Sequence, residues 1–426
     1  MMNLQERDKA VNWHPYTQMK TAGEVIPIVN GKGIYLYDTS GKMYIDAVSS
    51  WWVTLHGHAH PYIARRVSEQ LNTLEQVIFA GFTHEPAVQL SENLLKLLPA
   101  NQDKAFYSDN GSTAVEVALK MSIQYSHNHG KGKKKILAFK NAYHGDTFGA
   151  MSVSGRSVWT RPFEEMLFEV VYIDPPHAGN LENIKSQVKS VADETVCFIY
   201  EPLVQGAAGM LMHHAEDLSA LMAFCRQQDI LLIQDEVFTG FGRTGTLFAA
   251  DQLSEKPDIM CFSKGLTGGT MPMGITTCSA EIFNAFLSDD QYKTLFHGHS
   301  FTANPLACTA ALASMELLLQ DQTLMNIQEI IEKHLLFSQV LRKHPQVENV
   351  RQAGTILAWD FKTDGKTSYF NNIGKILYEE FINRGIIMRP LGNVMYLVPP
   401  YCITCEELYF VYQHISEVLD KLMMDM

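Results

Sequence analysis

The sequence predicts an α/β fold in which a large domain with a mainly parallel sheet is joined to a smaller α+β domain. Three observations lead to this prediction. Short apolar runs bounded by turn residues recur through the middle of the chain, helical patterns lie between them, and the last third changes to long helical patterns with alternating segments. A repeat of strand and helix is typical of a sheet that is covered by helices on both faces.

The apolar runs are the predicted strands of the large domain. They lie at Ile136–Phe139, Val196–Tyr200, Ile230–Ile233 and Ile259–Phe262. Each run is short enough for a strand and shows no polar alternation, so we expect both of its faces to be buried. Helical periodicity over Ser112–Tyr125 and Ala215–Gln228 supplies the helices between them.

The two ends of the chain are expected to form the smaller domain together. Helical patterns at Leu306–Leu319 and Met325–Lys343 lead into alternating segments at Ile356–Phe361 and Val394–Val398. The stretch Ile26–Asp46 alternates like a hairpin, with predicted turns at Asn30-Gly31 and Ser40-Gly41. We therefore expect residues 1–60 to pack with the small domain, residues 61–310 to form the large domain, and residues 311–426 to complete the small domain.

Composition restricts the partners of the chain. Its 426 residues include 34 Lys and Arg against 46 Asp and Glu, a net charge of -12. Such a surface repels phosphate backbones and anionic lipid headgroups, so we expect neither a nucleic acid nor a membrane partner. The first fifteen residues lack the apolar stretch of a secretory signal, and the seven cysteines lie mostly singly in apolar surroundings. A cytoplasmic location is therefore expected.

Two strand ends carry the residues that are best suited to catalysis. Asp235 ends one predicted strand, and Lys264 follows another strand 29 residues later. Ligands of α/β sheets bind beyond the carboxyl ends of strands, so both side chains are expected at one site. A lysine amine can form an imine with pyridoxal 5′-phosphate, and an ionised acid can keep the cofactor's ring nitrogen protonated. The alternative is that Asp235 caps a helix and Lys264 is a solvated loop lysine.

Two further segments suit the same cofactor. Gly111 and Ser112 open a helical pattern, where free backbone N–H groups favour a phosphate. Tyr143 follows a strand and places an aromatic side chain where a flat ring can stack. Plain N-capping by Ser112 and a core position for Tyr143 are the alternatives, and His144 is interpreted most simply as a structural histidine.

The motifs together resemble the class III (ω-) aminotransferases of the pyridoxal-phosphate fold type I. The resemblance runs from about residue 13 to about residue 400 and includes, in the family's order, Gly111-Ser112, Tyr143-His144-Gly145, Glu201-Pro202, the segment 235–245 and Ser263-Lys264-Gly265. It implies a pyridoxal-phosphate-dependent aminotransferase with a large cofactor domain, a small domain made from both chain ends, and a homodimer with shared active sites.

The resemblance also implies a role for each matching residue. Lys264 would be the catalytic, imine-forming lysine, Asp235 would bind the ring nitrogen, and Tyr143 would stack on the ring. Gly111 and Ser112 would bind the phosphate, and Ser300 would reach the phosphate of the neighbouring subunit's cofactor.

The N-terminal motifs narrow the resemblance to the branch of the family that converts 8-amino-7-oxononanoate to 7,8-diaminononanoate in biotin synthesis. They are Trp13-His14-Pro15-Tyr16-Thr17 and the adjacent Trp51 and Trp52. Adjacent tryptophans offer a large apolar wall with few rotatable bonds, which suits a long aliphatic oxo-acid. This branch implies S-adenosylmethionine as the amino donor. The residues expected near the substrates are Tyr16, Trp51, Trp52, Tyr143, Arg243, Gly298 and Arg389, with the planar fork of Arg389 on the distant carboxylate.

Several alternatives remain open at this level. Lysine could replace S-adenosylmethionine as the donor, and a 4-aminobutyrate or ornithine aminotransferase would share Lys264 and Asp235, although the tryptophan pair and the Tyr16 motif argue against it. A non-catalytic protein that binds the cofactor is a rival of another class. Arg243 could instead bond loop carbonyls, and one tryptophan of the pair could be core. No metal is expected, because His56, His58 and His60 have no further ligand motif beside them.

Overall fold

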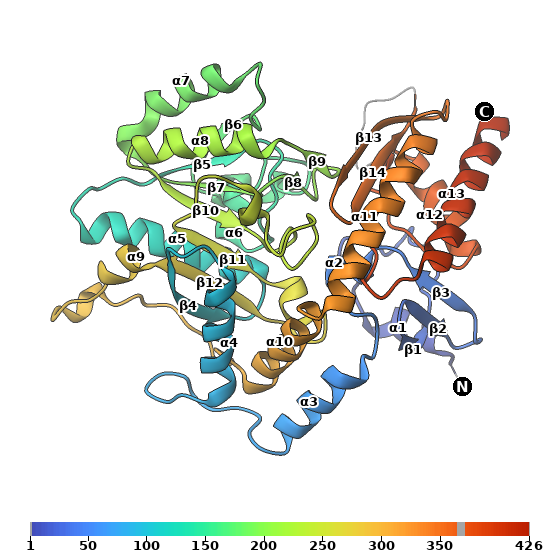
Figure 1. Cartoon of the computed structure of the whole chain (residues 1–426), viewed down its shortest axis with the longest axis horizontal. Coiled ribbons are helices and arrows are strands. Elements are labelled where there is room, and N and C mark those ends of the chain that lie inside the picture. The colour runs from blue at the N-terminus through green and yellow to red at the C-terminus, as the bar shows by residue number, and fades with distance from the viewer. Residues whose placement is uncertain (1, 364–370, 426) are drawn as a thin grey trace.

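The centre of the structure is a seven-stranded sheet with the order β4-β12-β11-β10-β7-β5-β6 (Figure 1). Neighbours from β11 to β6 pair in parallel, and β12 runs antiparallel to both of its neighbours. The strands are β4 (Gln102–Ser108), β5 (Lys135–Phe139), β6 (Val171–Ile173), β7 (Thr195–Tyr200), β10 (Leu231–Asp235), β11 (Ile259–Phe262) and β12 (Gly274–Ser279). The predicted mainly parallel sheet is confirmed in this computed structural model, which describes residues 2–363 and 371–425.

Helices bury both faces of this sheet. On β5, Ile136 and Ala138 pack in one core cluster with α5 (Gly111–Asn128), whereas Leu137 and Phe139 face a second cluster with α7 (Leu181–Val191) and α8 (Ala215–Gln227). Successive side chains of a strand point to opposite faces, so a strand that is buried on both sides is apolar at successive positions wherever no buried polar partner is available. This explains the uninterrupted apolar runs in the sequence.

The large domain contains further short elements around the sheet. They are α3 (Pro61–Leu71), α4 (Glu85–Leu97), α6 (Phe148–Val153), α9 (Ala280–Asn284), the 3₁₀ helices η1 (Arg161–Met166), η2 (Ala192–Glu194), η3 (Ala249–Gln252), η4 (Lys264–Thr267) and η5 (Gln291–Lys293), and the hairpin of β8 (Val204–Gln205) with β9 (Leu211–Met212). The buried helix α10 (Pro305–Leu318) packs on α3, α4 and η4. It is continuous across residue 310, where the sequence analysis placed a domain boundary.

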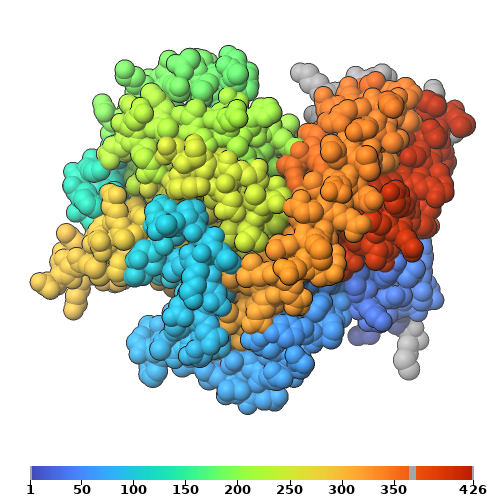
Figure 2. Space-filling model, viewed as in Figure 1, coloured from blue at the N-terminus to red at the C-terminus, as the bar shows by residue number. Residues whose placement is uncertain are grey.

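Both ends of the chain meet in the second lobe, where the N-terminal strands lie beside the C-terminal helices (Figures 1 and 2). One sheet has the order β1-β2-β3-β15 and the other β13-β14-β16. The parallel pairing of β3 with β15 joins the two ends directly. The elements are α1 (Leu4–Val11), β1 (Ile28–Lys32), β2 (Tyr35–Asp38), β3 (Met43–Asp46), α2 (Ser49–Trp52), α11 (Asp321–Leu341), β13 (Val347–Ala353), β14 (Ile356–Phe361), α12 (Ile373–Asn383), β15 (Ile386–Ile387), β16 (Val394–Leu397) and α13 (Cys405–Asp425).

One of the two predicted N-terminal turns is wrong. The turn at Ser40-Gly41 is confirmed, since it lies between β2 and β3, with Gly41 at a φ of 84°. Gly31 instead lies inside β1, and the chain turns at Gly33. Gly31 is required for space, because a Cβ there would lie 2.7 Å from the Cβ of His58. No helix among the described residues is long and apolar enough to cross a membrane.

Candidate active site

A cavity of about 460 Å³ lies beyond the carboxyl ends of β5, β7, β10 and β11. Parallel strands bring their carboxyl ends to one edge of the sheet, so residues that are distant in the sequence converge there. The lining residues are Trp52, Asn110, Gly111, Ser112, Tyr143, His144, Gly145, Asp146, Thr147, Glu201, Ala207, Asp235, Val237, Phe238, Thr239, Ser263 and Lys264.

Lys264 enters this cavity from the first residue of η4, directly after β11. Its φ of 46° is a left-handed conformation, which is uncommon for a residue with a Cβ. The Nζ atom lies 4.8 Å from the centre of the Trp52 ring. Burial lowers the pKa of the amine, and the nearby Asp235 and Glu201 only partly oppose this shift. The neutral amine, which is the nucleophilic form, is therefore easier to reach than in a solvated lysine.

Asp235 ends β10 and is buried beside Lys264. Its Oδ2 atom lies 2.7 Å from Nδ1 of His144, and its Oδ1 atom accepts the N–H of Val237 at 3.0 Å. The contact assigns His144 a supporting position behind the carboxylate. Nε2 of His144 is buried and finds no hydrogen-bond partner among the described residues.

A second carboxyl group, Glu201, lies buried at the end of β7. It accepts the backbone N–H of Tyr143 at 3.0 Å and that of Gly206 at 3.1 Å. Burial raises the pKa of Glu201 to about 7, the proximity of Asp235 adds to the shift, and His144 opposes it. Glu201 thereby ties the Tyr143 segment to the loop after β7.

The pKa of Glu201 predicts a pH dependence of stability for the cofactor-free chain. Its folded pKa of about 7 exceeds the ordinary value of 4.5, so the folded state holds a proton that the unfolded state has lost between these pH values. Stability should fall as pH rises through this window, by about 3 kcal/mol from this group. We expect Glu201→Gln to remove that part of the fall in urea unfolding curves measured from pH 5 to 8. Glu194→Gln, at an exposed glutamate, should leave the slope unchanged, and an unchanged slope in Glu201→Gln would contradict the assignment.

The N-terminus of α5 forms the opposite wall. Asn110 caps it reciprocally with Thr113, since each side chain accepts the other's backbone N–H. Gly111 and Ser112 follow the cap and line the cavity. Oγ of Ser112 accepts the N–H of Asp146 at 3.2 Å, and Gly145 fits against it only because it lacks a Cβ. A helix start with this exposure is suited to a phosphate.

Aromatic side chains form the inner wall. Trp52 is 5% exposed, and its ring lies 4.6 Å from that of Phe238. Nε1 of Trp52 donates to the hydroxyl of Tyr396 at 3.2 Å. Tyr143 is half-buried and lines the cavity between the ends of β5 and α5. These rings give the cavity a rigid apolar side next to Lys264.

A second set of aromatic residues forms the outer rim. Tyr16 contacts Trp51 and Trp159 edge to face, with ring centres 5.7 and 5.6 Å apart. Its hydroxyl donates to Asp146 at 2.5 Å and lies 3.4 Å from that of Tyr143. The rim therefore joins the N-terminal segment to the large domain.

Arg389 lies over Trp51 at this rim. The guanidinium carbon is 4.2 Å from the centre of the Trp51 ring, and no carboxylate of the described residues pairs with it. The arginine is half-buried and held by stacking. Its hydrogen-bonding fork is thus available for an anionic ligand.

Six of the residues expected at the site do not line the cavity. Tyr16, Trp51 and Arg389 lie at its rim, whereas Arg243, Gly298 and Ser300 lie elsewhere. Arg243 is 1% exposed and donates to the carbonyls of Pro399 at 2.9 Å and Thr54 at 3.2 Å. This geometry matches the alternative of a carbonyl-bonded arginine, and a contact of Arg243 with substrate stays a prediction. Gly298 and Ser300 lie on an exposed loop of the same chain, where Gln76 donates to the carbonyl of Ser300 at 2.7 Å.

The structure adds residues that the sequence analysis did not assign to the site. Asp146, Phe238 and Glu201 line the cavity, and Trp159 contacts Tyr16. Glu201 belongs to the motif Glu201-Pro202 and directly follows β7, and Asp146 directly follows the motif Tyr143-His144-Gly145, so both motifs were a usable signal. Trp159 belongs to an irregular segment with no periodicity, and its contact with Tyr16 spans 143 residues of sequence.

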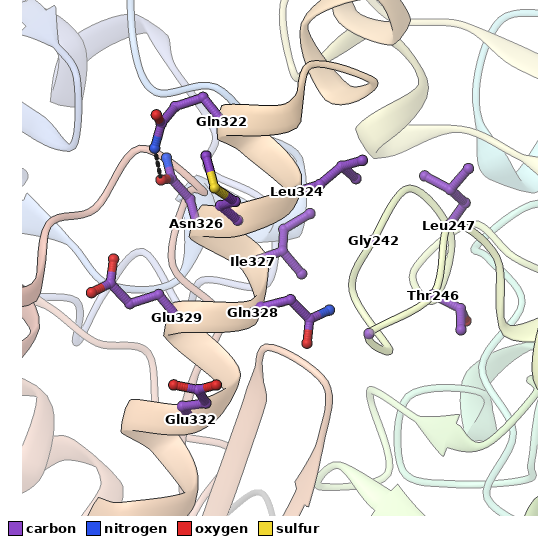
Figure 3. Close-up of a pocket in the computed structure, with 12 residues that line it drawn as sticks. Gly242, Thr246, Leu247, Gln322, Leu324, Asn326, Ile327, Gln328, Glu329 and Glu332 are labelled. Carbon is purple, nitrogen blue, oxygen red and sulfur yellow. Dashed lines mark hydrogen bonds between the residues drawn. The ribbon is translucent and has the colours of Figure 1, made fainter.

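Cavity size alone does not identify the site. A larger hollow of about 690 Å³ lies between the glycine-rich turn after β10 and α11, where Leu324, Ile327 and Gln328 point towards Thr246 and Leu247 (Figure 3). None of the predicted site residues lines it. The described residues also contain no group of three or more His, Cys, Asp or Glu side chains that could hold a metal ion.

Comparisons with known proteins agree with this geometry. The model of the family Aminotransferase class-III matches residues 17–419. The adenosylmethionine-8-amino-7-oxononanoate aminotransferase of Synechococcus elongatus is 46% identical over 421 residues, which cover 96% of this chain and 98% of that protein. The protein of the same name from Geobacter sulfurreducens is 38% identical over 431 residues, covering 96% and 95%.

Solved structures give the same picture. The crystal structure of adenosylmethionine-8-amino-7-oxononanoate aminotransferase from Methanocaldococcus jannaschii superposes with a TM-score of 0.95 at 36% identity and covers 98% of both chains. An omega transaminase from Pseudomonas jessenii in complex with PMP superposes with a TM-score of 0.93 at 26% identity, covering 99% of this chain and 98% of that one.

Proposed function

Because the chain belongs to the class III aminotransferases, we propose that it transfers an amino group from S-adenosylmethionine to 8-amino-7-oxononanoate with pyridoxal 5′-phosphate as cofactor. The product is 7,8-diaminononanoate, an intermediate of biotin synthesis. The observation that carries the proposal is the convergence of Lys264 and Asp235 in one cavity whose rim presents Arg389 over Trp51.

The residues of the cavity fit this cofactor. Gly111 and Ser112 would hold the phosphate at the start of α5, where glycine is required at position 111 because a Cβ there would lie 2.8 Å from Val237. Asp235, oriented by His144, would bind the ring nitrogen, and Tyr143 would cover one face of the ring. When bound, pyridoxal phosphate supplies an electron sink for the exchange of the amino group.

The chain itself supplies the proton transfers. The Nζ atom of Lys264, with its lowered pKa, would take the proton from the reacting carbon of the donor and return it on the cofactor side. Trp52 and Phe238 keep water away from that atom on one side. Donor and oxo-acid would use the same cavity in turn, which gives ping-pong kinetics.

Arg389 would bind the carboxylate at the far end of the oxo-acid. We expect Arg389→Met to raise KM for 8-amino-7-oxononanoate about 30- to 100-fold, since a desolvated arginine–carboxylate contact contributes about 2–3 kcal/mol. The visible absorbance of the bound cofactor should not change. Steady-state kinetics with varied oxo-acid would measure this.

Two further variants sharpen that experiment. Arg389→Lys keeps the charge without the planar fork and should give an intermediate KM. Arg384→Met is the matched control, because Arg384 pairs with Glu380 away from the rim, and its KM should equal that of the wild type. An Arg389→Met protein with unchanged KM would remove Arg389 from the site.

The identity of the donor is a finer part of the proposal. S-Adenosylmethionine carries a sulfonium, and the partly exposed aromatic side chains of Tyr16 and Trp51 are suited to contact a cation. The decisive experiment follows the visible absorbance of the purified holoenzyme after S-adenosylmethionine, or separately lysine, is added, and then after the oxo-acid is added. Bleaching by S-adenosylmethionine and recovery with the oxo-acid would support the whole proposal. Bleaching by lysine alone would change the donor, and failure of the oxo-acid to restore the absorbance would exclude the proposed acceptor.

We also propose a homodimer with shared sites in the cytoplasm. Ser300 and Gly298 lie on an exposed loop with Phe296 and Phe301, which are 68% and 64% exposed. Apolar side chains exposed to this extent favour burial against a second copy, which would bring Ser300 near the neighbouring cofactor's phosphate. Five of the seven free cysteines are buried, in keeping with a reducing compartment. Sedimentation velocity of the holoenzyme would test the dimer.

A further inference from the structure

We propose that Asp46 and His58 are positioning residues, a buried pair that fixes the turn carrying Trp51 and Trp52 and thereby the wall on which the oxo-acid lies. Neither residue lines the cavity. The inference rests on the proposed function for the identity of the substrate, but the contacts that carry it do not depend on that identity.

The turn from Ser49 to Trp52 has a strained backbone. Ser49, Ser50 and Trp52 have φ values of 52°, 60° and 67°, in the left-handed region that costs energy for a residue with a Cβ. None of the three is glycine, so surrounding contacts must hold the conformation. The turn is also functional, because it places Trp52 next to Lys264 and Trp51 beneath Arg389.

The carboxylate of Asp46 supplies contacts that hold the turn. Asp46 is fully buried at the end of β3. Its oxygens accept the backbone N–H of Val48 at 3.2 Å and that of Ser50 at 2.6 Å, and the Ser50 hydroxyl at 3.2 Å. A charged acceptor on a turn's N–H groups is stronger than a neutral one. The carboxylate thus locks the first half of the turn.

His58 holds that carboxylate in place. Its Nε2 atom lies 2.9 Å from Oδ2 of Asp46. The backbone N–H of His58 donates to the carbonyl of Gly33 at 2.7 Å, and its Cβ occupies the space that the missing side chain of Gly31 leaves. The β1–β2 hairpin therefore anchors the histidine, and the histidine anchors Asp46.

The same strand end also leads to the carboxylate-binding arginine. Asp46 is the register partner of Ile387 in the parallel pair β3–β15, and Arg389 follows two residues later. On the other side of the turn, Arg243 donates to the carbonyl of Trp52 at 3.5 Å. Asp46 therefore fixes the position of Trp51 relative to the strand that precedes Arg389. The stacked contact between Trp51 and Arg389 depends on Asp46 through both residues.

The test compares Asp46→Asn with Asp38→Asn in the holoenzyme. Asp38 is a matched control, because it also braces a turn of this sheet by accepting Ser40 N–H and Oγ, Lys42 N–H and the Tyr44 hydroxyl, away from the cavity. We expect Asp46→Asn to raise KM for the oxo-acid about 10-fold or more, because a small displacement of a binding wall has a large kinetic effect. The rate at which hydroxylamine bleaches the cofactor absorbance should not fall, because this small reagent makes no use of the contact between the oxo-acid and the wall. Asp38→Asn should match the wild type in both measurements.

A second pair of variants covers the case in which Asp46→Asn fails to fold. His58→Gln retains a donor for Asp46 and should restore wild-type KM, whereas His58→Leu should raise it. Hydrogen exchange at the amides of Val48 and Ser50 should be faster in His58→Leu than in His58→Gln, whatever the substrate is. Equal KM and equal exchange in the two His58 variants, or a parallel loss of hydroxylamine reactivity, would overturn the inference. A wild type that does not convert the oxo-acid would refute the proposed function alone. The hydrogen-exchange result would still show whether Asp46 and His58 hold the turn.

Discussion

Replacing Lys264 with alanine is expected to lower turnover by at least about 10⁴-fold. The variant loses both the nucleophile and the group that moves the proton, each of which contributes typically 10²–10⁴-fold. The side chain is placed for both roles, because its Nζ lies in the cavity and its pKa is lowered by burial. Single-turnover absorbance measurements with the donor would show the loss directly.

Two controls separate this effect from misfolding. Lys264→Arg keeps the positive charge and much of the volume, yet it should be nearly as inactive, since a guanidinium neither deprotonates nor attacks. Adding a small primary amine such as methylamine should partly restore turnover in Lys264→Ala, because the vacated space can admit a proton acceptor. A Lys264→Ala protein with turnover above about 1% of wild type would show that another base serves the reaction.

The fold could be predicted from the sequence where local patterns are regular. The strands β5, β7, β10 and β11 contain the apolar runs Ile136–Phe139, Val196–Tyr200, Ile230–Ile233 and Ile259–Phe262, and such runs depend only on burial of both faces of the sheet. Their polar ends then located Asp235 and Lys264, because parallel strands present their carboxyl ends at one edge. Gly31 shows the limit of local patterns, since its partner His58 lies 27 residues away and determines that the residue is glycine.

The rest of the site depends on contacts between distant segments. Arg243 follows a strand end as Lys264 does, but the carbonyls of Pro399 and Thr54 draw it away from the cavity. Those partners lie near the two ends of the chain, so the sequence around residue 243 does not predict these hydrogen bonds. Trp159 and Asp146 join the rim through Tyr16, whose position is set by an N-terminal segment with little regular structure. Ser300 is exposed in a single chain, and its predicted role needs a second copy.

Replacing Asp235 with asparagine is the other change with a large expected effect. A neutral amide cannot keep the ring nitrogen of the cofactor protonated, so the electron sink weakens although the shape of the site is kept. We expect kcat to fall about 10³-fold, the magnitude that follows the loss of a preorganised electrostatic partner. Stopped-flow measurement of the half-reaction with donor, together with cofactor retention on gel filtration, would separate slow chemistry from lost binding.

A matched control exists in the same sheet. Asp258 is also buried and directly precedes β11, where it accepts the N–H of Leu232 at 2.8 Å and pairs with Arg226, but it lies outside the cavity. Asp258→Asn should lower stability and leave kcat near that of the wild type. If Asp258→Asn and Asp235→Asn reduced kcat equally, the loss of activity in Asp235→Asn would result from impaired folding. A large loss of kcat confined to Asp235→Asn, with the cofactor still bound, would instead mean that the carboxylate acts on the cofactor ring.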